Sequence, residues 1–117
     1  MALGLPGVED RSSEARLALE VRGGRGLVWT YLKRQSPKKP RVPQPDAVAV
    51  RCELTRKEML VTAAPDRFFD DDHHRGYPAV LVRLPAIEEE EFAALLREAW
   101  RLAAPKALLE DASSRTR

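Results

Sequence analysis

The sequence predicts an α+β fold in which one antiparallel sheet has its helices packed on one face. Short stretches of alternating apolar and polar residues indicate strands, and a glycine-rich turn joins the first two as a hairpin. Two stretches with helical spacing follow as separate elements, which is typical of a two-layer α+β sandwich. The 117 residues fit one domain with one such core.

The first two strands are predicted from alternation and turn chemistry. Residues 16–22 alternate cleanly, with Leu17, Leu19 and Val21 on the buried face. Gly23–Gly26 then supplies positive-φ positions for a hairpin turn. The aromatic and β-branched residues 27–32 form the returning strand.

A proline-rich segment follows, with prolines at positions 37, 40, 43 and 45. Proline has no amide donor, so a central strand is not expected here, and the segment is interpreted as a long, stiff, partly polyproline-like connection. Alternation returns over residues 46–52. That strand is expected to place Val48, Val50 and Cys52 on one face.

The second half contains the clearest helix. Residues 88–103 carry apolar side chains at helical spacing, with Trp100 at the edge of the apolar arc and four glutamates at the positive end of the helix dipole. The apolar arc comprises Phe92, Leu95, Leu96, Ala99, Leu102 and Ala103. Residues 79–84 alternate as a strand just before it.

A shorter helix is expected between the strand at residues 46–52 and the strand at residues 79–84. Thr55 has the character of an N-cap, with Glu58 closing a capping box, and the helix ends before Pro65. A turn at residues 65–69 is expected to place Phe68 and Phe69 in the core.

The two ends of the chain are predicted from a proline-containing stop and a polar tail. Residues 1–7 have the character of a truncated first helix that stops at Leu5-Pro6-Gly7. One domain is expected over residues 1–111, with residues 112–117 as a disordered tail.

Composition bounds the class of protein. A hydrophobic fraction of 44% and a charged fraction of 32% are those of a globular protein, and no stretch approaches the roughly 18 apolar residues of a membrane span. The first ten residues lack the features of a secretory signal, and Cys52 is the only cysteine, which excludes an intrachain disulfide. A cytoplasmic protein with no membrane partner is therefore expected.

Charge is unevenly distributed along the chain. The net charge of +2 is too small to indicate nucleic acid by itself, but residues 1–69 carry 13 Lys/Arg against 8 Asp/Glu. Residues 70–117 carry 7 against 10. The basic excess is concentrated at Lys33, Arg34, Lys38, Lys39, Arg41 and Arg51, a segment in which Asp46 is the only acid.

Several stretches together resemble one protein family, in order and spacing and over nearly the whole chain. They are LGLPGVED (3–10), VRGGRGLVWTYL (21–32), APDRFF (64–69), HHRGYPAVLVRL (73–84) and LLREAWRLAAPKAL (95–108). These stretches resemble the MmcQ/YjbR family of small bacterial proteins. The chain departs from the family's pattern in its nearly absent first helix, and in Gly23-Gly24-Arg25 where a Gly-Lys is common.

The resemblance implies a CyaY-like fold and a DNA-binding role, with no signature of catalytic residues. The basic side chains that could neutralise phosphates in a non-specific, salt-sensitive way are Arg22, Arg25, Lys33, Arg34, Lys38, Lys39 and Arg41. The residues of the hairpin turn would then act as a wing tip. Trp29 and Tyr31 lie either on the exposed side of the sheet or under a helix.

The alternative hypothesis is a non-enzymatic protein-interaction or small-ligand module. Its site would be a cleft between the last helix and the proline-rich segment, with Trp100, Arg101 and Lys106 at its rim. Trp100 is otherwise a core residue at the helix edge. A monomer is favoured.

The run Asp70–His74 has the residue types of a metal or acid/base site. Its members are consecutive, however, and neighbours in extended chain point to opposite faces, so a polar loop before a strand is the preferred interpretation. Whether a carboxylate holds one of the two histidines stays open. Cys52 is interpreted as a small buried residue, and no cofactor, metal or catalytic residues are expected.

Overall fold

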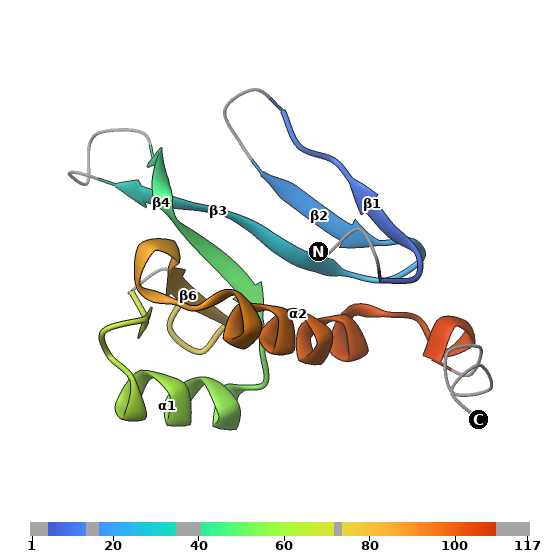
Figure 1. Ribbon diagram of the computed structural model, residues 1–117. Helices are drawn as coiled ribbons and strands as arrows, with labels where there is room; N and C mark the ends of the chain where they lie inside the picture. The colour runs from blue at the N-terminus through green and yellow to red at the C-terminus, as the bar shows by residue number, and fades with distance from the viewer. Residues whose placement is uncertain (1–4, 14–16, 35–40, 72–73, 110–117) are drawn as a thin grey trace.

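The computed structural model describes residues 5–13, 17–34, 41–71 and 74–109. Four strands come first along the chain, and the other two strands lie between the two helices (Figure 1). The elements are β1 (Val8–Asp10), β2 (Ala18–Val21), β3 (Gly26–Arg34), β4 (Arg41–Arg51), α1 (Leu54–Ala63), β5 (Phe68–Phe69), β6 (Ala79–Arg83), a 3-10 helix (Leu84–Ala86) and α2 (Glu89–Ala103).

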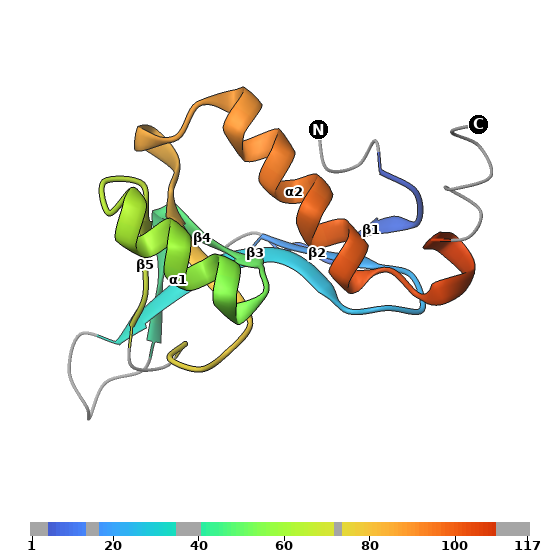
Figure 2. The ribbon, with the colours of Figure 1, turned by 90° about the horizontal axis from the view of Figure 1, so that it is seen from below.

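The strands form one antiparallel sheet in the order β1-β2-β3-β4-β6-β5. Both helices lie on the same side of this sheet (Figures 1 and 2). The expected α+β class, with helices on one face of an antiparallel sheet, is thereby confirmed. No helix among the described residues is long and apolar enough to cross a membrane.

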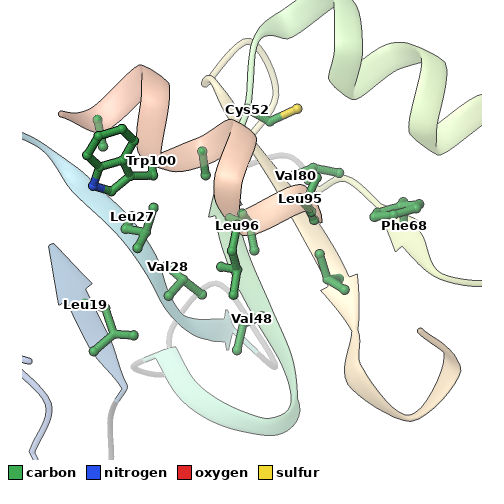
Figure 3. Packing of buried hydrophobic residues seen from close by; sticks show 14 of the residues in the cluster. Leu19, Leu27, Val28, Val48, Cys52, Phe68, Val80, Leu95, Leu96 and Trp100 are labelled. Atoms are coloured by element: carbon green, nitrogen blue, oxygen red, sulfur yellow. The ribbon is translucent and has the colours of Figure 1, made fainter. Parts of the chain in front are cut away.

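The main core lies between the sheet and the helices, as Figure 3 shows. Alternation along residues 47–51 of β4 and along β6 sends every second side chain, a valine each time, toward the helices, where the buried stripe of α2 covers them. The core residues of these elements are Val48, Val50, Val80, Val82, Leu95, Leu96, Ala99, Trp100 and Ala103. The expected buried faces of both strands and of the last helix are therefore confirmed, except for Leu102, which is 38% exposed.

The β2–β3 hairpin forms where glycines were expected to turn the chain. Gly23 has φ +71°, and Gly24 passes so close to the end of α2 that a Cβ on it would lie 1.9 Å from the carbonyl oxygen of Ala103. The Arg25 amide donates a hydrogen bond to that same oxygen over 2.9 Å. The hairpin turn therefore packs against the carboxyl end of α2 and is hydrogen-bonded to it.

A register shift in β2–β3 decides which face the aromatic residues take. Leu19 lies opposite Val28 while Glu20 lies opposite Gly26, so that β3 carries one extra residue there. Leu27 and Val28 both join the helix-side core, and Trp29 and Tyr31 lie on the other face of the sheet. The aromatic pair thus lies away from the helices, although Tyr31 is only 7% exposed.

The prediction of an irregular proline-rich connection is wrong for residues 41–45. β4 begins at Arg41 and contains Pro43 and Pro45, and it pairs with β3 from its first residue. β6 joins β4 only from Ala47 onward, so β4 has an open edge at Pro43, which pairs with Leu32 of β3. Pro45 lies between Pro43 and Val48, where the register of β4 against β3 shifts. A missing amide donor costs no ladder bond at an open edge. Residues 35–40 lie outside the described residues.

Three local predictions are corrected as well. Leu5–Gly7 forms a turn that leads into β1, and not a helix end, while residues 1–4 and 110–117 lie outside the described part. α1 begins at Leu54 with Glu53 as its N-cap and no side-chain cap, so Thr55 lies inside the helix and the capping box is absent. The Lys57 amide donates instead to the Glu53 carbonyl.

The consecutive phenylalanines of β5 go to opposite faces of the sheet. Phe68 is 1% exposed in the helix-side core, as expected, but Phe69 packs with Tyr31 on the face away from the helices. The expectation that both occupy one core is wrong for Phe69, because successive side chains of a strand point to opposite sides.

Candidate functional site

The basic residues that the sequence singles out lie at two opposite ends of β3. Arg22 and Arg25 are exposed at the β2–β3 turn, beside the carboxyl end of α2. Lys33 and Arg34 close the other end of β3, where Arg34 pairs with Arg41. β3 is nine residues long, and the two groups lie about 26 Å apart at its two ends. They do not form one continuous basic surface.

The second group belongs to a two-stranded extension of the sheet, which we call the arm: residues 32–34 of β3 and 41–43 of β4. Here β3 and β4 pair with each other and β6 does not reach them (Figure 1). Lys33, Arg34 and Arg41 lie on these strands, and Lys38 and Lys39 lie outside the described residues. No acid occurs between Lys33 and Pro45 in the sequence.

The expected cleft around Trp100, Arg101 and Lys106 does not form as predicted. Trp100 is 6% exposed, and its indole nitrogen donates to the Pro6 carbonyl over 2.7 Å, so it is a core residue and not a rim group. Arg101 and Lys106 are exposed. A Cβ on Gly23 would contact Pro105, which places the residue before Lys106 against the hairpin turn.

Arg101 instead borders a shallow hollow of about 230 Å³ between α1, α2 and the end of β4. Cys52 and Leu95 line it, and an ion pair of 3.6 Å between Arg56 and Glu98 lies at its border. Burial raises the pKa of the Cys52 thiol to about 11, helped by the nearby Glu98 carboxylate. The thiol therefore stays protonated near neutral pH, and the expected buried Cys52 is confirmed.

The face of the sheet away from the helices carries a continuous series of rings, which we call the aromatic row. Trp29 contacts Tyr77 with ring centroids 6.3 Å apart, and Tyr77 contacts His74 at 6.3 Å. His74 contacts Tyr31 at 6.1 Å, and Tyr31 contacts Phe69 at 5.4 Å. Neighbouring rings are tilted or edge-on, the geometry that aromatic pairs prefer.

An arginine lies over the ring at each end of the aromatic row. The Arg51 guanidinium is 5.7 Å from the Trp29 ring centre, and its Nε donates to the Gly26 carbonyl over 2.6 Å. The Arg83 guanidinium lies 4.2 Å from the centre of Phe69. Such contacts are favourable because the ring face is electronegative.

The loop between β5 and β6 supplies two members of the row. The Asp71 carboxylate accepts hydrogen bonds from the His74 backbone amide and lies 2.8 Å from His74 Nδ1. The Tyr31 hydroxyl also donates to Asp71. A carboxylate thus holds one of the two histidines, which answers the question left open by the sequence, while Asp72 and His73 lie outside the described residues. The described chain contains no group of three or more metal-ligating side chains.

The side chain of Lys57 anchors the β5–β6 loop to α1. No pattern in the sequence indicated this role for Lys57. Its side chain is buried on α1, and Nζ donates to the carbonyls of His74 over 2.6 Å and Tyr77 over 3.1 Å. The third partner is the Asp70 carboxylate at 2.9 Å. All three ammonium protons therefore have acceptors, two of them backbone groups that no residue pattern encodes.

The Asp71 contacts predict a pH dependence of stability. Burial acts to raise the pKa of Asp71, but the hydrogen bonds from His74 and Tyr31 outweigh it and hold the pKa below 3.8. A carboxyl with a lowered folded-state pKa stabilises the fold above its unfolded-state pKa, and this contribution is lost as pH falls through the folded-state value. Asp71→Asn is therefore expected to destabilise the protein at about pH 7 and much less at about pH 3.

Urea unfolding at the two pH values checks this expectation. Asp66→Asn is the matched control, because that carboxylate is 65% exposed, and surface substitutions typically change stability by less than about 0.5 kcal/mol. A loss of stability in Asp71→Asn that is equal at both pH values would contradict the role given to the charge.

The fold and its site define a two-layer α+β protein with one helix-covered and one aromatic sheet face. A model of the YjbR family matches residues 3–102, which is most of the chain, and the protein therefore belongs to the YjbR family. The resemblance seen in the sequence is thereby confirmed.

Similar curated proteins come from mycobacteria. The chain is 42% identical over 69 residues to the "Uncharacterized protein Rv2570" of Mycobacterium tuberculosis and to the "Uncharacterized protein Mb2600" of Mycobacterium bovis. The match covers 58% of this chain and 54% of each relative, so the chain spans about half the length of the curated relatives that it matches. No solved structure matches the chain significantly.

Proposed function

We propose that this protein is a non-enzymatic DNA-binding protein that contacts the phosphate backbone through the arm. The observation that carries the proposal is the arm itself, a paired β-ribbon that extends past β6 and belongs to a segment with five cations and no acid. A two-stranded ribbon fits the DNA major groove, which is about 12 Å wide. The family resemblance, which implies a DNA-binding role, supports the same class of partner.

The geometry favours the arm over the β2–β3 turn as the main contact. Arg22 and Arg25 lie about 26 Å away at the other end of β3, so the two basic groups cannot act as one patch. Phosphate contacts contribute through local charge, which salt screens beyond about 10 Å. The hairpin turn is therefore at most a separate, weaker contact.

Acidic residues limit the side from which DNA can approach the arm. β6 ends at Arg83 opposite Ala47 of β4, and the chain then passes through the short 3-10 helix into α2, whose first turn contains Glu89, Glu90 and Glu91. These carboxylates therefore lie at the arm's end of the sheet, on the helix side. DNA on the arm is expected to extend over the face of the sheet that the helices leave open.

Binding is expected to be weak at moderate salt and strongly salt-dependent. About four phosphate contacts predict an affinity loss of about 100-fold between about 50 and 200 mM salt. Fluorescence anisotropy with a labelled DNA duplex measures both quantities. Simultaneous replacement of Lys33, Arg34, Lys38, Lys39 and Arg41 by alanine is expected to remove most of the affinity and to flatten the salt slope.

Arg22→Ala/Arg25→Ala is the matched control, because it removes exposed arginines from the opposite end of β3. This double variant is expected to keep the salt slope within about one unit of the original protein. Equal affinity and equal slope in the arm variant and the original protein would refute the proposal.

The small-ligand alternative has less support in the geometry. The hollow beside Arg101 measures about 230 Å³, below the roughly 300 Å³ at which ligand pockets begin. Its border carries the Arg56–Glu98 ion pair, so two of its charged groups already pair with each other. The DNA-binding proposal is therefore the one that we carry forward.

A further inference from the structure

We propose that the aromatic row binds single-stranded nucleic acid by stacking bases against its exposed rings. The inference rests on the proposed function, because the arm supplies the phosphate contacts that bring a strand to this face. It goes beyond that function by naming a second surface and the form of nucleic acid that it binds.

Some rings of the aromatic row are buried and hold the others in place, and the remaining rings are exposed enough to contact a ligand. Tyr31 and His74 are 7% and 6% exposed and fix the positions of the others. Tyr77 is 44% exposed, while Trp29 and Phe69 are half-buried. Exposed rings that are held by buried neighbours lose little side-chain entropy on binding, which suits them to stacking.

The sheet beneath the row explains why rings gather there. The central strands present Ala47, Ala49, Ala79 and Leu81 to this face. The alanines leave room above the sheet, and the β5–β6 loop fills part of it with His74 and Tyr77. The loop is anchored by the buried Lys57, so its rings form a fixed surface.

The dimensions of the row fit a short single strand. Trp29 lies opposite Ala49, Ala49 opposite Leu81, and Leu81 opposite Phe69, so that the row crosses three strand spacings, or about 14 Å. Sheets that bind single strands stack two or three bases on surface rings. Duplex DNA is excluded from this mode, because its base faces are already stacked on each other.

Charge at one end of this face also favours a nucleic acid. Arg83 is exposed over Phe69, and a guanidinium stacked on a ring still presents N–H groups in its plane to a phosphate. Arg51, at the other end of the row, is buried and donates to the Gly26 carbonyl. Asp71 keeps its negative charge, but its contacts with His74 and Tyr31 already occupy the carboxylate.

Two acids on the neighbouring β1–β2 part of the sheet share one arginine. Glu9 and Glu20 both pair with Arg11, at 3.8 and 3.1 Å. Among these three side chains one negative charge stays unbalanced, so a bound strand is not expected to extend over this part of the sheet.

The experiment compares a thymidine oligonucleotide of about 12 nucleotides with a duplex of the same length, by anisotropy and by tryptophan emission. We expect the single strand to bind at least about 10-fold more tightly and to quench the emission of Trp29. Tyr77→Ser is expected to lower single-strand affinity at least about fivefold and to leave duplex affinity unchanged.

Two further variants complete the test. Met59→Ser is the matched control, because Met59 is 56% exposed on α1 and lies away from the row, and it is expected to leave both affinities unchanged. Trp29→Leu is expected to abolish the quenching, since the other tryptophan, Trp100, is buried on the helix side.

The outcomes separate this inference from the proposed function. Equal binding of both DNA forms, lost in the arm variant but unaffected by Tyr77→Ser, overturns the aromatic surface and leaves the arm proposal standing. Single-strand binding lost with Tyr77→Ser but not in the arm variant supports the aromatic surface and refutes the arm. An absence of quenching by any oligonucleotide, as expected if this face binds a protein instead, overturns the inference.

Discussion

Phe68→Ala is expected to lower the free energy of unfolding by about 4 kcal/mol. The ring is 1% exposed and lies in the helix-side core, against α1 on one side and β6 on the other. β5 contains only two residues at the edge of the sheet and cannot move in to fill the space without losing its pairing with β6. The cost therefore combines lost burial with an unfilled cavity, and urea unfolding measures it.

The neighbouring residue provides the matched control. Phe69 lies on the opposite face, half-buried beneath Arg83, and Phe69→Ala is expected to cost about 1–2 kcal/mol. Equal losses for the two alanine variants would contradict the assignment of the two rings to opposite faces.

Lys57→Met is expected to lower the free energy of unfolding by about 2–3 kcal/mol. Methionine keeps most of the buried apolar volume but donates no hydrogen bonds. The carbonyls of His74 and Tyr77 would each keep only one backbone donor, from the Tyr77 and Ala79 amides respectively. The Asp70 carboxylate is 30% exposed, so water compensates it in part and keeps the loss below that of a fully buried ion pair.

A second readout shows whether the loss is local. Amide hydrogen exchange of residues 74–79 is expected to accelerate in Lys57→Met, because the loop loses its attachment to α1. Arg56→Met is the matched control on the same helix: its ion pair with Glu98 is exposed on both sides and is worth less than about 1 kcal/mol. Unchanged exchange in the loop of Lys57→Met would rule out the anchoring role.

Alternation was the most informative feature of the sequence for the fold. In β4 and β6 the valines at positions 48, 50, 80 and 82 predicted the helix-side face correctly. The residues between these valines also carried information about the opposite face of the sheet. They are mostly alanines, namely Ala47, Ala49 and Ala79. Small residues at every second position predict that another part of the chain covers that face, and here the β5–β6 loop covers it.

Other features depend on tertiary context that the sequence does not show. Pro43 and Pro45 are compatible with β4 because β6 does not reach them and because the register of β4 against β3 shifts between Pro43 and Val48. Neither feature follows from the prolines themselves. Lys57 acts through backbone carbonyls whose position depends on the loop. The separation of the basic residues follows from the length of β3.

The strand order has a consequence for how the chain folds. From β1 to β4 each strand pairs with the next strand along the chain, and β5 pairs with β6, so that most of the sheet closes short loops. Loop closure is entropically cheap at this length, and chains dominated by such local contacts fold quickly for their size. The hydrogen bond between Trp100 and the Pro6 carbonyl spans 94 positions and belongs to the contacts with the largest closure cost. It is therefore expected to join the two ends of the described chain late in folding, after the hairpins have formed.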